Sequence, residues 1–145
     1  GAEWGGGRGD PPVVGPLHLE PMRYAPLARE HGWYAVRVLS VFVGDVEITA
    51  PGADPSVLRG FNDGKGTIVD SGTTDTFLPA ASEKPVAAVW KIATGRRYSN
   101  RSEAYSHDEF RRLPTITLNI EGGIVWSIRP EAYMEWNRDK TPLAG

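Results

Sequence analysis

The chain has 145 residues, enough for one hydrophobic core, and its formal net charge of −2 comes from 16 basic and 18 acidic residues spread along the sequence. No basic block suits nucleic acid or an anionic membrane surface. Cysteine is absent, which excludes disulfides and thiolate metal sites, and the three histidines are too scattered to suggest metal ligands. We therefore expect one domain with no metal, no cofactor and no nucleic acid partner.

The beginning of the chain is rich in glycine. Residues 1–15, GAEWGGGRGDPPVVG, contain too few large apolar side chains to pack. They are expected to form a flexible arm or a linker. The folded domain is expected to occupy residues 16–145.

Strand and turn signals dominate the first half of that domain, which favours a mainly β fold. Residues 33–43, WYAVRVLSVFV, are almost entirely apolar and rich in β-branched side chains. This pattern predicts a long and mostly buried strand. Gly44-Asp45 is expected to turn the chain so that residues 46–49 pair back. Residues 51–66 contain four glycines and two prolines and predict an exposed loop.

One main helix is expected after Leu78-Pro79. Pro85 suits a first helical turn, so the regular helix is predicted to begin there. Gly95 is placed to end the helix with a left-handed cap. The apolar residues that recur at helical spacing between these points are Val86, Val89, Trp90 and Ala93.

A short helix and a hairpin are predicted near the end of the domain. Ser106 and Glu109 have the spacing of a capping box, which predicts a helical turn through Arg112. Residues 115–120 alternate in polarity and are expected to form a strand. Residues 124–128 return as its hairpin partner after a glycine-containing turn.

The main candidate site is the sequence KGTIVDSGTTDTF, residues 65–77. Ile68 and Val69 are expected to end a buried strand and to deliver Asp70 to a turn that Gly72 makes possible. Such a turn would surround one carboxylate with hydroxyl and backbone N–H donors, an arrangement suited to acid and base chemistry. The alternative is an Asx-type turn, in which Asp70 and the threonines only satisfy their own backbone.

This stretch resembles the second active-site motif of the pepsin-like aspartic proteases. In that motif two apolar residues precede Asp-Ser/Thr-Gly-Thr/Ser-Thr/Ser, and Leu-Pro and a helix follow, as in residues 67–79 here. Upstream, residues 15–22 are similar to the family's crossover from the amino-terminal lobe, and residues 33–45 to the strand that opens the carboxy-terminal lobe. Downstream, residues 113–123 and 130–133 are similar to that lobe's last hairpin and its adjoining Pro-x-x-Tyr.

The resemblance implies a role for each residue of the motif. Asp70 would be one of two catalytic aspartates, and the Thr73 hydroxyl would hydrogen-bond its carboxylate. Ser71 would join the hydrogen bonds between the two lobes, and Gly72 would supply a close backbone approach and an N–H. Thr74 would lie near the substrate backbone. The fold would be the carboxy-terminal lobe of the bilobal pepsin-like architecture, over residues 16–145 and cut short in this chain.

The resemblance also implies a reaction and a partner. In the family, one aspartate takes a proton from water while the other donates a proton to the scissile carbonyl, and the two carboxyls share one proton. This chain has no second Asp-Thr/Ser-Gly. An amino-terminal protease lobe would therefore supply the other aspartate, the substrate would be a peptide or protein, and the chain alone would be inactive. A secretory or endomembrane location accompanies the family.

Two other functions stay open. A pepsin-like module that has lost catalysis could bind peptides or proteins, as a subunit of an assembly. A homodimer of the retroviral kind could take one aspartate from each copy. The intact Asp70 motif favours the enzyme over the binding module, and the length of the chain argues against the homodimer. Separately, residues 100–102, Asn-Arg-Ser, match the acceptor sequence for N-glycosylation at Asn100, usable only in the secretory pathway.

Overall fold

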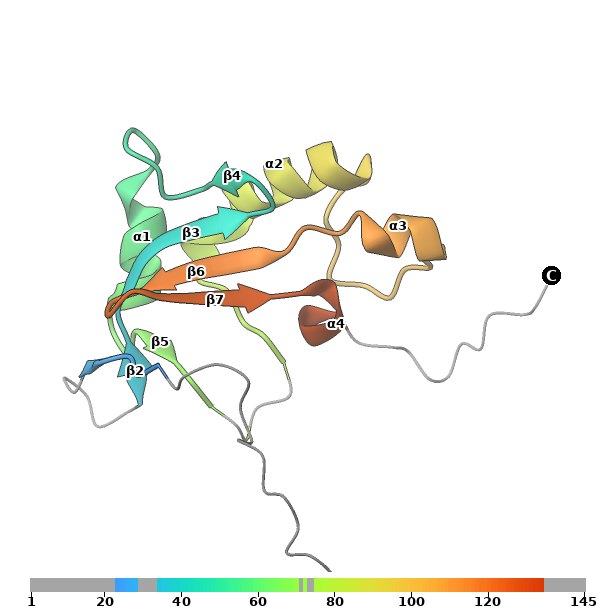
Figure 1. Cartoon of the computed structure of the whole chain (residues 1–145). Coiled ribbons are helices and arrows are strands. Elements are labelled where there is room, and N and C mark those ends of the chain that lie inside the picture. Colours follow the sequence, from blue (N-terminus) through green and yellow to red (C-terminus); the bar gives the residue numbers. More distant parts are fainter. Residues whose placement is uncertain (1–22, 29–33, 71, 73–74, 135–145) are drawn as a thin grey trace, which may run out of the picture.

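A computed structural model gives the fold of the chain and describes residues 23–28, 34–70, 72 and 75–134 (Figure 1). The predictions made for residues 1–22, for Trp33, and for residues 135–145 lie outside these ranges. So do those for Ser71, Thr73 and Thr74.

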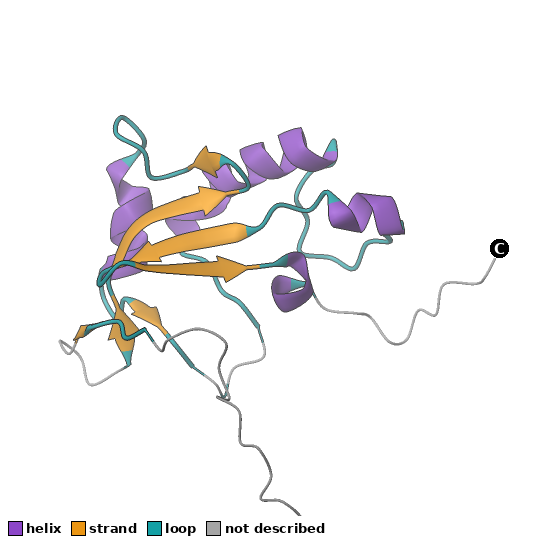
Figure 2. Cartoon of the chain, in the orientation of Figure 1, coloured by secondary structure: helices purple, strands orange, loops and turns teal. Residues whose placement is uncertain are grey.

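The described chain is mainly β, as the sequence predicts, with two antiparallel sheets and a few helices (Figure 2). The strands are β1 (Leu27–Ala28), β2 (Ala35–Val36), β3 (Val38–Val43), β4 (Val46–Glu47), β5 (Thr67–Ile68), β6 (Ile116–Ile120) and β7 (Ile124–Ile128). The helices are α1 (Pro55–Asn62), α2 (Glu83–Thr94), α3 (His107–Arg111) and α4 (Pro130–Tyr133), with a 3-10 turn η1 (Ala80–Ser82).

The larger sheet has four strands in the order β4-β3-β6-β7. Its two central strands come from distant parts of the sequence, with Val41 opposite Leu118 and Val43 opposite Ile116. The Asn119 side chain donates to the Ser40 hydroxyl across this pairing, at 2.7 Å and over 79 residues of sequence. The predicted hairpins on either side, β3–β4 and β6–β7, are confirmed.

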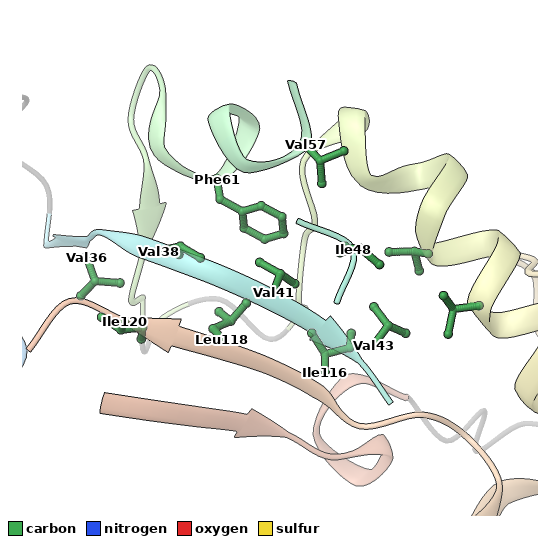
Figure 3. Close-up of a cluster of buried hydrophobic side chains, with 12 residues drawn as sticks. Val36, Val38, Val41, Val43, Ile48, Val57, Phe61, Ile116, Leu118 and Ile120 are labelled. Atoms are coloured by element: carbon green, nitrogen blue, oxygen red, sulfur yellow. The ribbon is translucent and has the colours of Figure 1, made fainter. Parts of the chain in front are cut away.

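The hydrophobic core lies on one face of this sheet, under α1 and α2 (Figure 3). Alternate side chains of β6 are buried on that face, as the period-2 pattern predicts, while the residues between them are half-buried. Val125 of β7, on the opposite face, is 63% exposed. The core cluster consists of Val36, Val38, Val41, Val43, Ile48, Val57, Phe61, Val86, Val89, Ile116, Leu118 and Ile120.

The long strand predicted over residues 33–43 is divided at Arg37. The β2 segment belongs to a three-stranded sheet of order β1-β2-β5, and β3 belongs to the larger sheet. The Asn62 side chain forms hydrogen bonds with the Val38 backbone, on the edge of β3 that faces away from β6, as a neighbouring strand would. It accepts from the Val38 N–H at 2.8 Å and donates to the Val38 carbonyl at 2.8 Å. Both backbone groups are thus satisfied where the chain leaves one sheet for the other.

The prediction of a loop over residues 51–66 is wrong, because α1 occupies its centre. The Asp54 side chain caps the helix by accepting from the Ser56 N–H at 2.9 Å, and a proline follows at the first helical position. Val57 and Phe61 are one turn apart and both are buried against the sheet. Burial of this apolar pair outweighs the glycine and proline content that suggested a loop.

One glycine of α1 has a packing role. A Cβ at Gly60 would lie only 2.9 Å from the Pro79 Cβ, so glycine lets α1 approach the segment that precedes η1. Residues 67–79 contain the candidate site, and the last of them, Pro79, therefore packs against α1.

The main helix, α2, is confirmed, but it begins at Glu83, two residues before Pro85. Pro85 still lies in the first turn, where its missing N–H costs no helical hydrogen bond. The left-handed cap at Gly95 is confirmed, with φ of 73°. Of the predicted apolar face, Val86, Val89 and Trp90 are buried, whereas Ala93 is exposed.

The capping box of α3 is also confirmed. The Ser106 hydroxyl accepts from the Glu109 N–H at 3.2 Å, and the Glu109 carboxylate accepts from the Ser106 N–H at 2.7 Å. The same carboxylate pairs with Arg96 at 2.7 Å. Hydrogen bonds from Ser106 and the nearby Arg96 guanidinium lower the pKa of Glu109 below its ordinary value of 4.5.

This lowered pKa predicts that the capping box opens in acid. Because the folded state favours the ionised Glu109, the stabilisation is present above pH 4.5 and is lost as the pH falls through the lower pKa of the folded protein. In an NMR titration, the Ser106 amide resonance should move with a midpoint below pH 4.5. Glu109→Gln should abolish that transition, and Glu131→Gln should leave it unchanged. A Ser106 midpoint above 4.5 would contradict the prediction.

Candidate functional site

The candidate site begins where β5 leaves the three-stranded sheet. β5 pairs with β2 through Ile68 opposite Ala35, and the Val69 N–H donates to the Tyr34 carbonyl at 3.1 Å. The Thr67 hydroxyl donates to the Phe61 carbonyl at the end of α1, at 2.8 Å. Two elements therefore fix the backbone that leads into Asp70.

The expectation that Ile68 and Val69 end a buried strand is wrong. Ile68 is half-buried, and Val69 is 45% exposed. The reason lies in the sheet, because β5 is an edge strand in a sheet whose strands are two residues long. An apolar run of this kind does not by itself distinguish a covered strand from an open edge.

Asp70 is exposed, and its carboxylate accepts a hydrogen bond from the Gly72 N–H at 2.8 Å. This contact between residues i and i+2 is the Asx-type turn that the sequence left open as an alternative. A Cβ at Gly72 would lie 3.3 Å from an Asp70 carboxylate oxygen, which is tighter than most contacts of a real Cβ. Glycine at this position therefore lets the backbone approach the carboxylate closely.

Gly72 is thus an expected partner that the structure does bring to the Asp70 carboxylate. The other expected residues of the motif, Ser71, Thr73 and Thr74, lie outside the described residues. The roles that the resemblance implies for these three residues stay predictions.

Several other aspartates have local structural roles. Asp54 caps α1, and hydrogen bonds from Ser56 lower its pKa. Asp63 is the residue that ends α1, and Asp108 forms an ion pair with Arg111 at 2.8 Å within α3. These three carboxylates therefore have structural roles in helix caps and in an ion pair.

Exposed apolar residues occur on the segments that lead into and away from Asp70. Tyr34, whose carbonyl is bonded to the residue before Asp70, is 72% exposed, and Phe77 farther along the same segment is 78% exposed. Val69, the residue before Asp70, is 45% exposed. Single exposed apolar residues are common, and of these three described residues only Tyr34 and Val69 are joined by a hydrogen bond, next to Asp70.

A shallow groove that the sequence did not predict lies elsewhere, along the outer side of α2. It does not include Asp70. The residues that line it are Ala87, Ala88, Lys91, Arg97 and Tyr98. The signal for it in the sequence is weak, because small and cationic residues at helical spacing are also typical of an ordinary solvent-facing helix surface.

Neither a metal centre nor a membrane span emerges from the described residues. In those ranges, no three His, Asp or Glu side chains gather closely enough to hold an ion. No helix in the described part of the chain has the length and apolar character needed to cross a bilayer.

Comparisons with known proteins do not assign the chain to a family. No family model matches it, and no curated protein matches it at a significant level.

Proposed function

We propose that this chain is a lobe of a pepsin-like aspartic endopeptidase and that Asp70 is one of its two catalytic aspartates. The observation that carries the proposal is the motif itself, Asp-Ser-Gly-Thr-Thr at residues 70–74 after an apolar strand. The exposed Asp70 carboxylate, with a backbone N–H aimed at it from Gly72, supports the proposal. The helix that follows Pro79, η1 running into α2, occurs where the family motif has one.

The chemistry needs a second carboxyl group. One aspartate of the pair accepts a proton from water as the water oxygen attacks the scissile carbonyl carbon, and the other donates its proton to the carbonyl oxygen. The tetrahedral intermediate then collapses with transfer of a proton to the leaving amine. Asp70 supplies one carboxyl, and an amino-terminal lobe with its own Asp-Thr-Gly supplies the other. The titration behaviour belongs to the pair.

The second candidate is a binding module without catalysis. The exposure of the apolar residues Tyr34, Val69 and Phe77 favours it, because apolar side chains are those that a bound peptide or protein covers. The local hydrogen bond between Gly72 and Asp70 also suits a turn with a purely structural role. The two candidates differ in whether the Asp70 carboxylate is needed.

The test is hydrolysis by the full-length protein that contains this chain. We expect cleavage of a quenched fluorescent peptide library between about pH 3 and pH 7, with a maximum in acid, because the catalytic pair must hold one shared proton. A statine-type peptide, which presents a hydroxyl in place of the tetrahedral intermediate, should block the cleavage. A well-folded protein that binds library peptides but cleaves none of them at any pH would support the binding module instead.

A further inference from the structure

The connection between α2 and α3 is a loop closed by one side chain. The Arg96 guanidinium donates to the Ala104 carbonyl at 2.9 Å and pairs with the Glu109 carboxylate at 2.7 Å. It also lies 5.1 Å from the centre of the Tyr105 ring. These contacts tie the beginning of the loop to its end, with residues 97–103 between them.

Asn100 lies in the middle of this closed loop and is exposed, as are both residues that follow it. Neighbouring groups hold the turn, since the Arg101 N–H donates to the Ser99 hydroxyl at 3.1 Å. The packing of the loop against α2 comes from Tyr98, whose ring meets Trp90 edge to face at 5.5 Å. Residues other than Asn100 thus maintain the loop, and a large group can be attached to Asn100 without displacing the core.

We propose that Asn100 is an acceptor for N-linked glycan. Asn100-Arg101-Ser102 is the sole Asn-x-Ser/Thr sequence in the chain, and no proline interrupts it. In the transfer, the Asn100 amide nitrogen bonds to the anomeric carbon of a lipid-linked oligosaccharide diphosphate. The bond from that carbon to the diphosphate breaks, and the amide releases one proton. The host oligosaccharyl transferase recognises the Ser102 hydroxyl of the acceptor sequence.

The place of the loop makes this modification compatible with a site at Asp70. The loop joins α2 to α3 at one end of the four-stranded sheet, and β5, which leads into Asp70, lies near the other end (Figure 1). A glycan on Asn100 would therefore be attached on the connection that lies away from β5. The inference rests on the secretory location that accompanies the proposed protease family, and it does not depend on catalysis at Asp70.

The experiment is expression of the full chain behind a cleavable signal peptide in eukaryotic cells. The secreted protein should run as a heavier species that collapses to one lighter band after removal of N-glycans, and peptide mass spectrometry should place the modification on Asn100. Asn100→Gln and Ser102→Ala should each remove the heavier species. Both substitutions are at exposed positions, so neither should change secretion of the folded chain.

If Asn100 is not glycosylated, the cause is either a poor acceptor or a chain that never met the transferase. A matched control distinguishes the two causes. Asp45→Asn with Glu47→Thr creates a second acceptor sequence at the exposed turn after β3. This variant should gain one further glycan. If the new acceptor at position 45 is glycosylated while Asn100 in the same molecule is not, the proposal is overturned.

Discussion

Replacing Asp70 by asparagine is expected to lower the turnover of peptide hydrolysis in the full-length protein by about 100-fold to 10,000-fold, the range for loss of a general acid or base. Asparagine keeps the shape of the side chain and a carbonyl oxygen that can accept from the Gly72 N–H, so the turn should persist. What it removes is the ability to exchange a proton with water or with the second aspartate of the proposed pair. The measurement is the initial rate of cleavage of a quenched peptide.

Asp75→Asn is the control for this substitution. Asp75 is exposed and lies five positions further along the same segment, so its replacement changes the net charge equally. We expect Asp75→Asn to retain wild-type turnover. Equal rates in wild type and Asp70→Asn, with unchanged unfolding curves, would remove Asp70 from the mechanism and leave the motif a structural turn.

Replacing Phe61 by alanine is expected to lower the free energy of unfolding by about 3–5 kcal/mol, the usual cost of removing a buried phenylalanine. The ring is 3% exposed and lies between α1 and β3, in contact with the core cluster (Figure 3). Domains of this size are stable by only about 5–15 kcal/mol, so the variant should be near the limit of folding. Urea unfolding followed by tryptophan fluorescence measures the change.

Phe77→Ala provides the comparison, because it removes the same ring from a site that is 78% exposed. The expected change in unfolding free energy is within about 0.5 kcal/mol. If the two alanine variants lose similar free energy of unfolding, the burial of Phe61 and the exposure of Phe77 would be contradicted. Phe61→Leu should fall between them, since leucine refills part of the space left under α1.

Local sequence patterns predicted the two hairpins of the larger sheet, but not the pairing of β3 with β6 that joins them. Polarity alternates in residues 115–120, and two glycines separate this run from the mainly apolar residues 124–128. Those signals depend only on neighbours in sequence. The structure confirms the hairpin, with both turn glycines at positive φ, 95° for Gly122 and 73° for Gly123. The capping box at Ser106 and the end of α2 at Gly95 are local in the same sense, and both were found where the sequence placed them.

The wrong predictions concern residues whose burial or pairing depends on segments that are distant in sequence. The glycines and prolines of residues 51–66 predicted a loop, but α1 forms there. The helix is stabilised because Val57 and Phe61 pack against β3, which is distant in sequence and so does not appear in the local pattern. The division of the predicted strand at Arg37 has the same origin, because the two halves pair with different strands. For the candidate site, the sequence predicted the turn at Asp70, but not that the strand before it is an exposed edge.

The pairing of β3 with β6 decides when the fold can form during synthesis on a ribosome. Ser40 and Asn119, which meet across that pair, are separated by 79 residues, so β3 emerges long before the strand that completes it. Until then the β3 edge is open, and contacts of such long range make folding slow. Chains that stop before Ile116 therefore leave an apolar strand without its central neighbour, and they should be the products that chaperones retain and proteases remove.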